Sequence, residues 1–234
     1  MATKIVVDAG HGGSNPGAVY QGRRESDDAL RLAMAVGRIL EENGYDVSYT
    51  RTTDTTQSVG QKAAIANEEG ADLFVSIHRN AAEYPGKYSG VQTLIYDDSG
   101  IKKEMAQNIN ANLERLGFRN AGVSIRPNLV VLNSTQMPAL LVEAGFIDST
   151  TDNQLFDSRF QAIAQGIADG IMETLENQNV SGGGNMTGNS MGNNMGNNMM
   201  GNGQNCPVCP SMPEGTGPEQ ELYRVQAGAF RDRQ

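Results

Sequence analysis

The sequence predicts an α/β fold: one domain with a mostly parallel central sheet of about six strands, flanked by helices on both faces and followed by a disordered tail. Two observations lead to this prediction. Short apolar runs alternate with longer stretches of helical periodicity over residues 1–179, which is typical of strand–helix units around a parallel sheet. The composition then changes, because residues 180–205 are rich in Gly, Asn and Met and hold no charged or aromatic residue. Such a segment cannot bury enough apolar surface to offset its ordering entropy.

The individual elements follow from the hydrophobic pattern. Apolar residues at steps of three and four predict helices, and Gly44 and Gly70 would end the first two of them. The run GVQTLIY alternates in polarity and is expected nearer an edge of the sheet. The expected strands are residues 4–8, 45–50, 72–77, 90–96, 128–133 and 139–143, and the expected helices are residues 25–43, 58–69, 101–116 and 154–175.

Charge and composition exclude several classes of protein. The net charge of −9 argues against binding to nucleic acid or to an anionic membrane surface. No apolar stretch reaches transmembrane length, so membrane insertion is not expected. The start, MATKIVVDAG, has no signal-peptide core, so we expect synthesis in the cytoplasm without an ordinary export signal. The cysteines, Cys206 and Cys209, are expected as free thiols, although a disulfide remains open.

Four polar residues are predicted to meet at one edge of the sheet. His11, His78 and Glu143 lie at or just past the carboxyl ends of expected strands, and Glu25 opens the first long helix. Sites in open α/β sheets form at this edge. Two imidazoles and one carboxylate suit a catalytic zinc ion, and a second carboxylate would serve as general base. The spacing leaves open which glutamate has which role, and Glu143 could instead pair with Arg126.

The same residues carry a family resemblance. The segments VDAGHGG (7–13), ESD (25–27), SIHRNA (76–81) and MPALLVEAGFID (137–148) resemble the motifs of zinc-dependent N-acetylmuramoyl-L-alanine amidases, in the same order along residues 1–179. This resemblance implies Zn²⁺ held by His11, Glu25 and His78, with Glu143 as the catalytic carboxylate. It implies hydrolysis of the amide bond that joins N-acetylmuramic acid to L-alanine in peptidoglycan.

Other residues near these motifs set further expectations. Asn80, two residues past His78, is a candidate for contact with the stem peptide, and Arg126 is a candidate for binding the substrate. Arg79 stands where the family often has a small residue, and it would alter the substrate groove. Other zinc-dependent wall peptidases or deacetylases, a phage-type endolysin and a non-catalytic wall-binding protein remain as alternatives. No obligate protein partner is evident.

A second and shorter resemblance lies at the end of the chain. The segment ELYRVQAGAF (221–230) resembles the first strand of a SPOR-type peptidoglycan-binding repeat. We therefore expect a catalytic domain at 1–179, a linker with the CPVC motif at 180–220 and a truncated repeat at 221–234. With no export signal, the enzyme would reach the wall after lysis or by a non-classical route. The repeat favours lysis of the mother-cell wall in sporulation.

Overall fold

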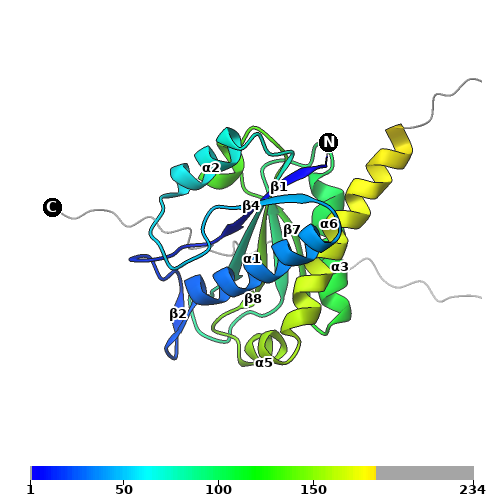
Figure 1. Ribbon diagram of the computed structural model, residues 1–234. Helices are drawn as coiled ribbons and strands as arrows, with labels where there is room; N and C mark the ends of the chain where they lie inside the picture. The colour runs from blue at the N-terminus through cyan, green and yellow to red at the C-terminus, as the bar shows by residue number, and fades with distance from the viewer. Residues whose placement is uncertain (1, 183–234) are drawn as a thin grey trace, which may run out of the picture.

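The computed structural model describes residues 2–182, which form a single α/β domain with a six-stranded sheet between two layers of helices (Figure 1). The strand order is β4-β1-β5-β8-β6-β7, and a small hairpin of β2 and β3 stands apart from the sheet. The predicted fold class is confirmed. The strands are β1 Lys4–Ala9, β2 Val19–Tyr20, β3 Arg23–Arg24, β4 Asp46–Tyr49, β5 Leu73–Asn80, β6 Val91–Ile95, β7 Asn120–Ile125 and β8 Ala139–Phe146. The helices are α1 Glu25–Glu42, α2 Val59–Glu68, α3 Lys102–Arg115, α4 Val130–Asn133, α5 Thr150–Ser158 and α6 Phe160–Gly182.

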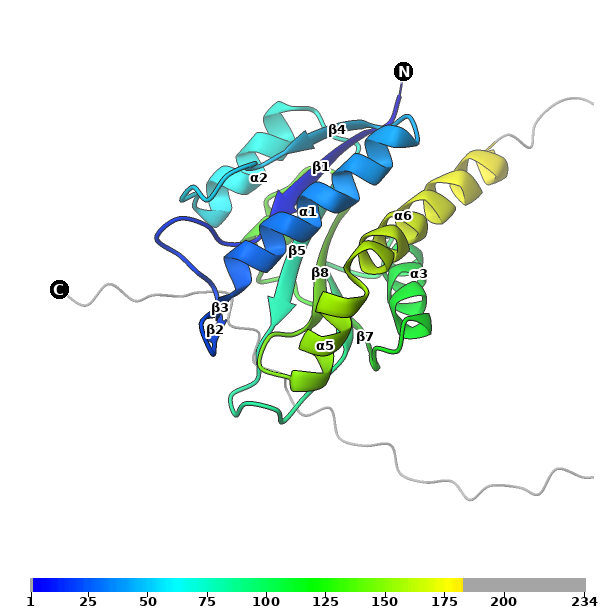
Figure 2. The same cartoon turned by 60° about the horizontal axis from the view of Figure 1, so that its bottom comes forward.

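The direction of the strands determines where a site can form. Strands β4, β1, β5 and β8 run parallel to one another, whereas β6 runs antiparallel to β8. Strand β7 is parallel to β6, so this pair points the opposite way from the rest. We call the edge at which β1, β5 and β8 end the carboxyl edge. Figure 2 shows the β2–β3 hairpin and α5 near this end of the sheet.

The core has two parts, one on each face of the sheet. Alternate residues of a strand point to opposite faces, so Val75 of β5 joins the larger cluster, while Phe74 joins the smaller one. The larger cluster packs the sheet against α1, α3 and α6, and the smaller one packs it against α2 and α4. These two layers exclude water from both faces of the central strands.

The structure corrects one predicted strand. Residues 128–133 do not form a strand, because Val130–Asn133 is the short helix α4, which buries Val131 and Leu132 against the smaller cluster. The sixth strand is instead β7, which was not predicted. Strand β7 lies at the edge of the sheet, is largely half-buried and contains Gly122 with a φ of 84°. An edge strand needs few large apolar residues, so its hydrophobic signal is weak.

Two further boundaries differ from the predictions. The helix predicted at 154–175 is two helices, α5 and α6, separated at Arg159, whose backbone leaves the helical region. Helix α6 also continues to Gly182, past the change of composition at residue 179.

Strand β6 lies one position in from the edge of the sheet, as expected, but all five of its residues are buried.

The remaining predictions about domain organisation concern the end of the chain. The greater part of the linker at 180–220, its CPVC motif and the repeat at 221–234 lie outside the described residues. Within residues 2–182, no helix has the length and apolar character needed to cross a membrane.

Candidate active site

The structure brings His11, Glu25 and His78 together at the carboxyl edge. His11 lies two residues after β1, Glu25 is the first residue of α1, and His78 lies two residues before the end of β5. Glu25 Oε1 lies 3.0 Å from His11 Nε2 and 2.8 Å from His78 Nδ1. The two imidazole rings stand nearly perpendicular, with their centroids 4.9 Å apart. One carboxylate oxygen therefore faces both histidines.

Hydrogen bonds from neighbouring groups hold this arrangement. His11 Nδ1 lies 3.2 Å from Asn15 Oδ1, which leaves Nε2 to face the centre of the group. The backbone amide of Ala18 donates to Glu25 Oε2, and that of Arg79 donates to Glu25 Oε1. Partners of this kind fix the orientation of metal ligands.

The charges of the three groups depend on one another. Burial by itself raises the pKa of Glu25, but hydrogen bonds and charge interactions with His11 and His78 outweigh it and lower that pKa well below its ordinary value. Burial lowers the pKa of His11, but the hydrogen bond and the charge of Glu25 more than offset this and raise it. Glu25 is therefore a carboxylate at neutral pH.

The donor set fits a zinc ion. The ligand atoms of His11, Glu25 and His78 all lie within 4.8 Å of one another. Three nitrogen and oxygen ligands with a fourth position left for water are the usual pattern of catalytic zinc. Within residues 2–182, this is the one cluster of His, Cys, Asp or Glu whose geometry suits a metal ion.

Glycines in the loop after β1 have two roles: some allow a positive φ, and others leave space for neighbouring side chains. His11 itself has a φ of 57°, a left-handed conformation that is rare for residues other than glycine. Gly12 and Gly13 also have positive φ. Gly10 does not, and its role is different: a Cβ at this position would collide with the ring of His78. A Cβ at Gly17 would likewise collide with Glu25 and His11.

Glu143 lies beside this group in β8. It is paired in register with His78 of β5, so the two side chains leave the sheet on the same face. Glu143 is 3% exposed, and its Oε2 has no hydrogen-bond partner among the described residues. Burial, and then the charge of Glu25, raise its pKa well above the ordinary value, although Arg79 opposes the shift. A buried carboxyl group with a raised pKa is typical of a general acid or base.

Arg79 does not line a substrate groove, contrary to our expectation. Its side chain is fully buried on the other face of β5, where Nη1 lies 2.7 Å from Asp28 Oδ2 and Nη2 lies 2.7 Å from Asn153 Oδ1. The guanidinium group also lies over the ring of Phe156, 4.1 Å from its centroid. This direction is the ordinary alternation of a strand, in which the residue next to His78 points to the opposite face. Arg79 therefore connects β5 to α1 and α5.

The two candidates for substrate contact lie at opposite edges of the sheet. Asn80 ends β5 at the carboxyl edge, and its Nδ2 is buried without a partner among the described residues. Arg126 follows β7, and its backbone amide donates to Ile95 O. Ile95 pairs with Leu140, near the start of β8, so Arg126 lies away from Glu143 and cannot pair with it. The structure thus keeps Asn80 near the candidate site and places Arg126 outside it.

A buried polar network beneath the site was not predicted. Asp8 Oδ1 accepts a hydrogen bond from Lys62 Nζ at 2.6 Å, and Asp8 Oδ2 accepts one from Ser76. Lys62 also donates to Ala9 O, and Arg51 donates to the carbonyl oxygens of Ala9 and of the next residue. The sequence signal that could have found the network is Asp8, a charged residue within the apolar run KIVVDA.

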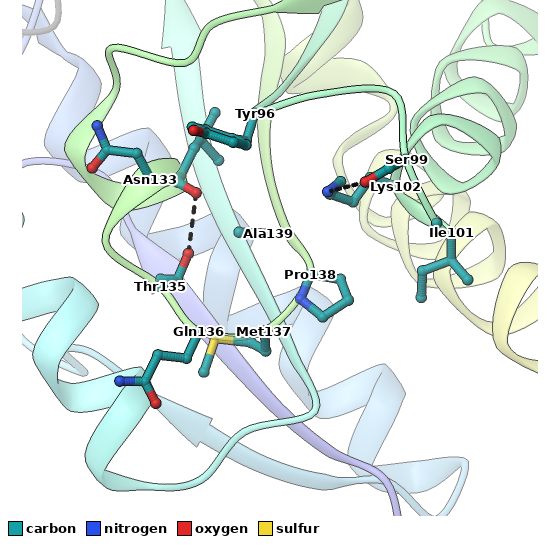
Figure 3. Close-up of a pocket in the computed structure, with 12 residues that line it drawn as sticks. Tyr96, Ser99, Ile101, Lys102, Asn133, Thr135, Gln136, Met137, Pro138 and Ala139 are labelled. Carbon is teal, nitrogen blue, oxygen red and sulfur yellow. Dashed lines mark hydrogen bonds between the residues drawn. The ribbon is translucent and has the colours of Figure 1, made fainter.

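A separate pocket of about 440 Å³ lies at the opposite edge of the sheet (Figure 3). Tyr96, Lys102 and Met137 line it, together with Ala139, the first residue of β8. Lys102 Nζ is already held 2.8 Å from Asp97 Oδ1. None of the residues that line this pocket belongs to the group around Glu25, so the pocket is distinct from that group.

Comparison with known proteins identifies a family. Residues 5–173 match the family described as N-acetylmuramoyl-L-alanine amidase. The chain is 38% identical over 167 residues to the sporulation-specific N-acetylmuramoyl-L-alanine amidase of Bacillus subtilis, and 40% identical over 167 residues to the N-acetylmuramoyl-L-alanine amidase CwlM of Bacillus licheniformis. Each match covers 69% of this chain and 64% of the relative's length.

Solved structures show the same fold. The N-acetylmuramoyl-L-alanine amidase from Clostridium difficile 630 superimposes with a TM-score of 0.71 at 30% identity, covering 75% of this chain and 97% of that one. The catalytic domain of the amidase CwlV from Bacillus (Paenibacillus) polymyxa gives a TM-score of 0.68 at 33% identity, covering 74% and 98% of the two chains.

Proposed function

The chain belongs to the N-acetylmuramoyl-L-alanine amidase family, and we propose that it is a zinc-dependent enzyme that cleaves the amide bond between N-acetylmuramic acid and L-alanine in peptidoglycan. The observation that carries this proposal is the convergence of His11, Glu25 and His78, with the buried Glu143 beside them. The match covers 64% of the length of each of these two relatives. The activity proposed for this chain therefore rests on its own site as well as on the likeness to these proteins.

We propose that His11, Glu25 and His78 hold the zinc ion. Zinc in such a site activates a water molecule and polarises the carbonyl group of the substrate. Glu25 would supply the negative charge that offsets the cation, since its low pKa keeps it ionised. Asn15, the Ala18 amide and the Arg79 amide would keep the ligands in place before the metal arrives.

Glu143 is the proposed proton carrier. It would take a proton from the attacking water and deliver it to the departing nitrogen of L-alanine. Its Oε2, which has no partner within residues 2–182, can make a hydrogen bond to a water molecule or to the amide. Its raised pKa lets the carboxyl group hold the proton between the two steps. Asn80 is retained as a candidate donor to the stem peptide.

The bond that is cut can be tested directly. The full chain, supplied with zinc, should digest purified peptidoglycan and release stem peptides with a new L-alanine amino terminus, leaving the glycan chains intact. Mass analysis of both fractions identifies the bond. A chelator should stop the release, and Glu143→Gln should slow it by about 10²-fold or more while the protein still binds zinc.

The alternatives give different products. A wall peptidase would open bonds inside the stem peptide, and a deacetylase would release acetate and leave the stems attached. A wall-binding protein without activity would give no product at all. Full activity in Glu143→Gln, or zinc binding at wild-type strength in His11→Ala, would contradict the assigned roles.

We further propose that the enzyme lyses cell wall during sporulation. The relative from Bacillus subtilis, described as sporulation-specific, supports this extension. Deleting the gene in its host should delay release of the spore from the mother cell. Unchanged timing would separate the enzyme from that process without affecting its assignment as an amidase.

A further inference from the structure

Arg51 is a buried arginine whose hydrogen bonds to the described part of the chain all go to backbone carbonyl groups. It follows β4 by two residues and is 4% exposed. Its Nη2 donates to Gly10 O at 2.7 Å and to Ser26 O at 2.9 Å. Its Nε donates to Ala9 O at 3.0 Å, and its Nη1 donates to Thr53 O at 3.1 Å. One planar group thus joins three separate segments of the backbone.

Two of these segments carry proposed metal ligands. Gly10 directly precedes His11, and Ser26 directly follows Glu25. The same nitrogen, Arg51 Nη2, binds both carbonyl groups. The position of the loop after β1 relative to the first turn of α1 therefore depends on this side chain.

The loop that Arg51 holds needs an external constraint. His11 has a left-handed backbone conformation, which costs energy in a residue with a side chain and persists only where the surroundings enforce it. Arg51 also packs against the loop itself, since a Cβ at Gly12 would collide with its side chain. The constraint thus acts on both sides of His11.

Burying the positive charge of Arg51 costs free energy of folding. Burial lowers the pKa of Arg51, although the charges of Asp8, Asp54 and Asp27 partly offset it. No carboxylate of residues 2–182 lies within 4.0 Å of the guanidinium group, whereas the other arginine buried beside the site, Arg79, contacts Asp28. A buried cation that is balanced mainly by carbonyl groups costs stability, which favours a role in positioning over a role in stability alone.

We propose that Arg51 is a positioning residue that holds His11 and Glu25 at the separation that zinc binding requires. The proposal rests on the zinc site of the proposed function. It predicts that loss of the guanidinium group weakens zinc binding in a protein that is still folded. Residues that orient metal ligands typically change affinity by about 10- to 100-fold when they are replaced.

The test measures zinc affinity without using catalysis. Metal-free full-length protein competes for zinc with a chromogenic chelator, and urea unfolding of the metal-free form gives its stability. Arg51→Met should bind zinc about 10- to 100-fold more weakly than wild type. Arg51→Lys should recover part of this loss, because an ammonium group can bind Gly10 O or Ser26 O but lacks the planar fork that reaches both.

Asn110→Ala is the matched control. Asn110 is 1% exposed and hydrogen-bonds Thr93 Oγ1 and Gly122 O, on the side of the sheet that holds β6 and β7. This variant should lose stability but keep wild-type zinc affinity. Zinc affinity in Arg51→Met within about twofold of wild type would overturn the proposal, as would a parallel loss in Asn110→Ala.

Two further outcomes are also decisive. If Arg51→Met does not fold, Arg51→Lys decides, because wild-type zinc affinity in that variant contradicts a positioning role. If the wild-type protein itself does not bind zinc, the proposed metal site fails as well. The two failures are thus distinguishable.

Discussion

Close packing of glycine against histidine and glutamate sets the geometry of the candidate site at the scale of single residues. Gly10 lies against the ring of His78, and Gly17 lies against Glu25 and His11. Neither position leaves space for a methyl group. The small residues around His11 therefore determine where its partners lie.

We expect Gly10→Ala to weaken zinc binding by about tenfold or more, the scale seen for groups that orient metal ligands. The added methyl group must displace the ring of His78. Chelator competition measures the effect. Gly60→Ala is the control, because Gly60 in α2 has open space around it and its replacement should leave zinc affinity unchanged. Wild-type affinity in Gly10→Ala would show that the ring can move without cost.

Asp8 should make stability depend on acid pH. Burial raises the pKa of Asp8, but Lys62 together with Ser76 and Thr50 outweighs burial and lowers it below its ordinary value of 3.8. A lowered pKa stabilises the fold above pH about 4, and this contribution is lost as the pH falls through the folded-state pKa. Asp8→Asn should cost about 3–5 kcal/mol at pH 7, because it leaves Lys62 buried without its carboxylate.

Urea unfolding from pH 7 to pH 2.5 checks this prediction. The difference between wild type and Asp8→Asn should shrink below pH about 4. The double variant Asp8→Asn/Lys62→Met should recover much of the loss, since it removes both charges. A constant difference across the pH range would show that the charge of Asp8 is not what stabilises the pair.

The sequence allowed some of these residues to be predicted and not others. His11, His78 and Glu143 could be placed at one edge because parallel strands bring their carboxyl ends together. Arg51 could not be predicted, because its partners are backbone carbonyl groups, which carry no sequence signal. The direction of Arg79 was missed although it could have been predicted, because the residue that follows His78 in a strand points to the opposite face of the sheet.

At the scale of elements, α3 and α6 approach each other closely at Gly170. A Cβ at Gly170 of α6 would collide with the backbone of Ile109 in α3. Gly166, one turn earlier in α6, has only ordinary contacts around its Cβ position. The two helices therefore meet backbone to backbone at one point.

Gly170→Ala should destabilise the protein by about 1–3 kcal/mol, because the helices must separate. Gly166→Ala should be neutral or stabilising by up to about 1 kcal/mol, because alanine favours the helix. Chemical unfolding of both variants gives the comparison. Equal effects at the two positions would contradict the close approach.

Helix periodicity predicted the elements that pack along one face, such as α1 and α3. It did not distinguish a short buried helix from a short buried strand, because residues 128–133 are apolar without enough length to show a period. It also joined α5 to α6, since the interruption at Arg159 changes the direction of the chain without glycine or proline to mark it.

At the scale of the whole molecule, the proposed metal would join three parts of the chain: the loop after β1, the start of α1 and the end of β5. Zinc that binds only the folded state should stabilise it by about 2.7 kcal/mol at a free concentration 100 times the dissociation constant. Urea unfolding with zinc and with a chelator measures this gain. His78→Ala should show no gain, and an equal gain in that variant would indicate that zinc binds elsewhere.

The strand order has a consequence for biosynthesis. Strand β8 carries Glu143 and inserts between β5 and β6, although it is the last strand to be made. A nascent chain that has emerged only as far as β7 lacks one of the two central strands of the sheet and the carboxyl group on which the proposed hydrolysis would depend. A chain that ends before β8 should therefore be unable to form the complete sheet or the proposed catalytic centre.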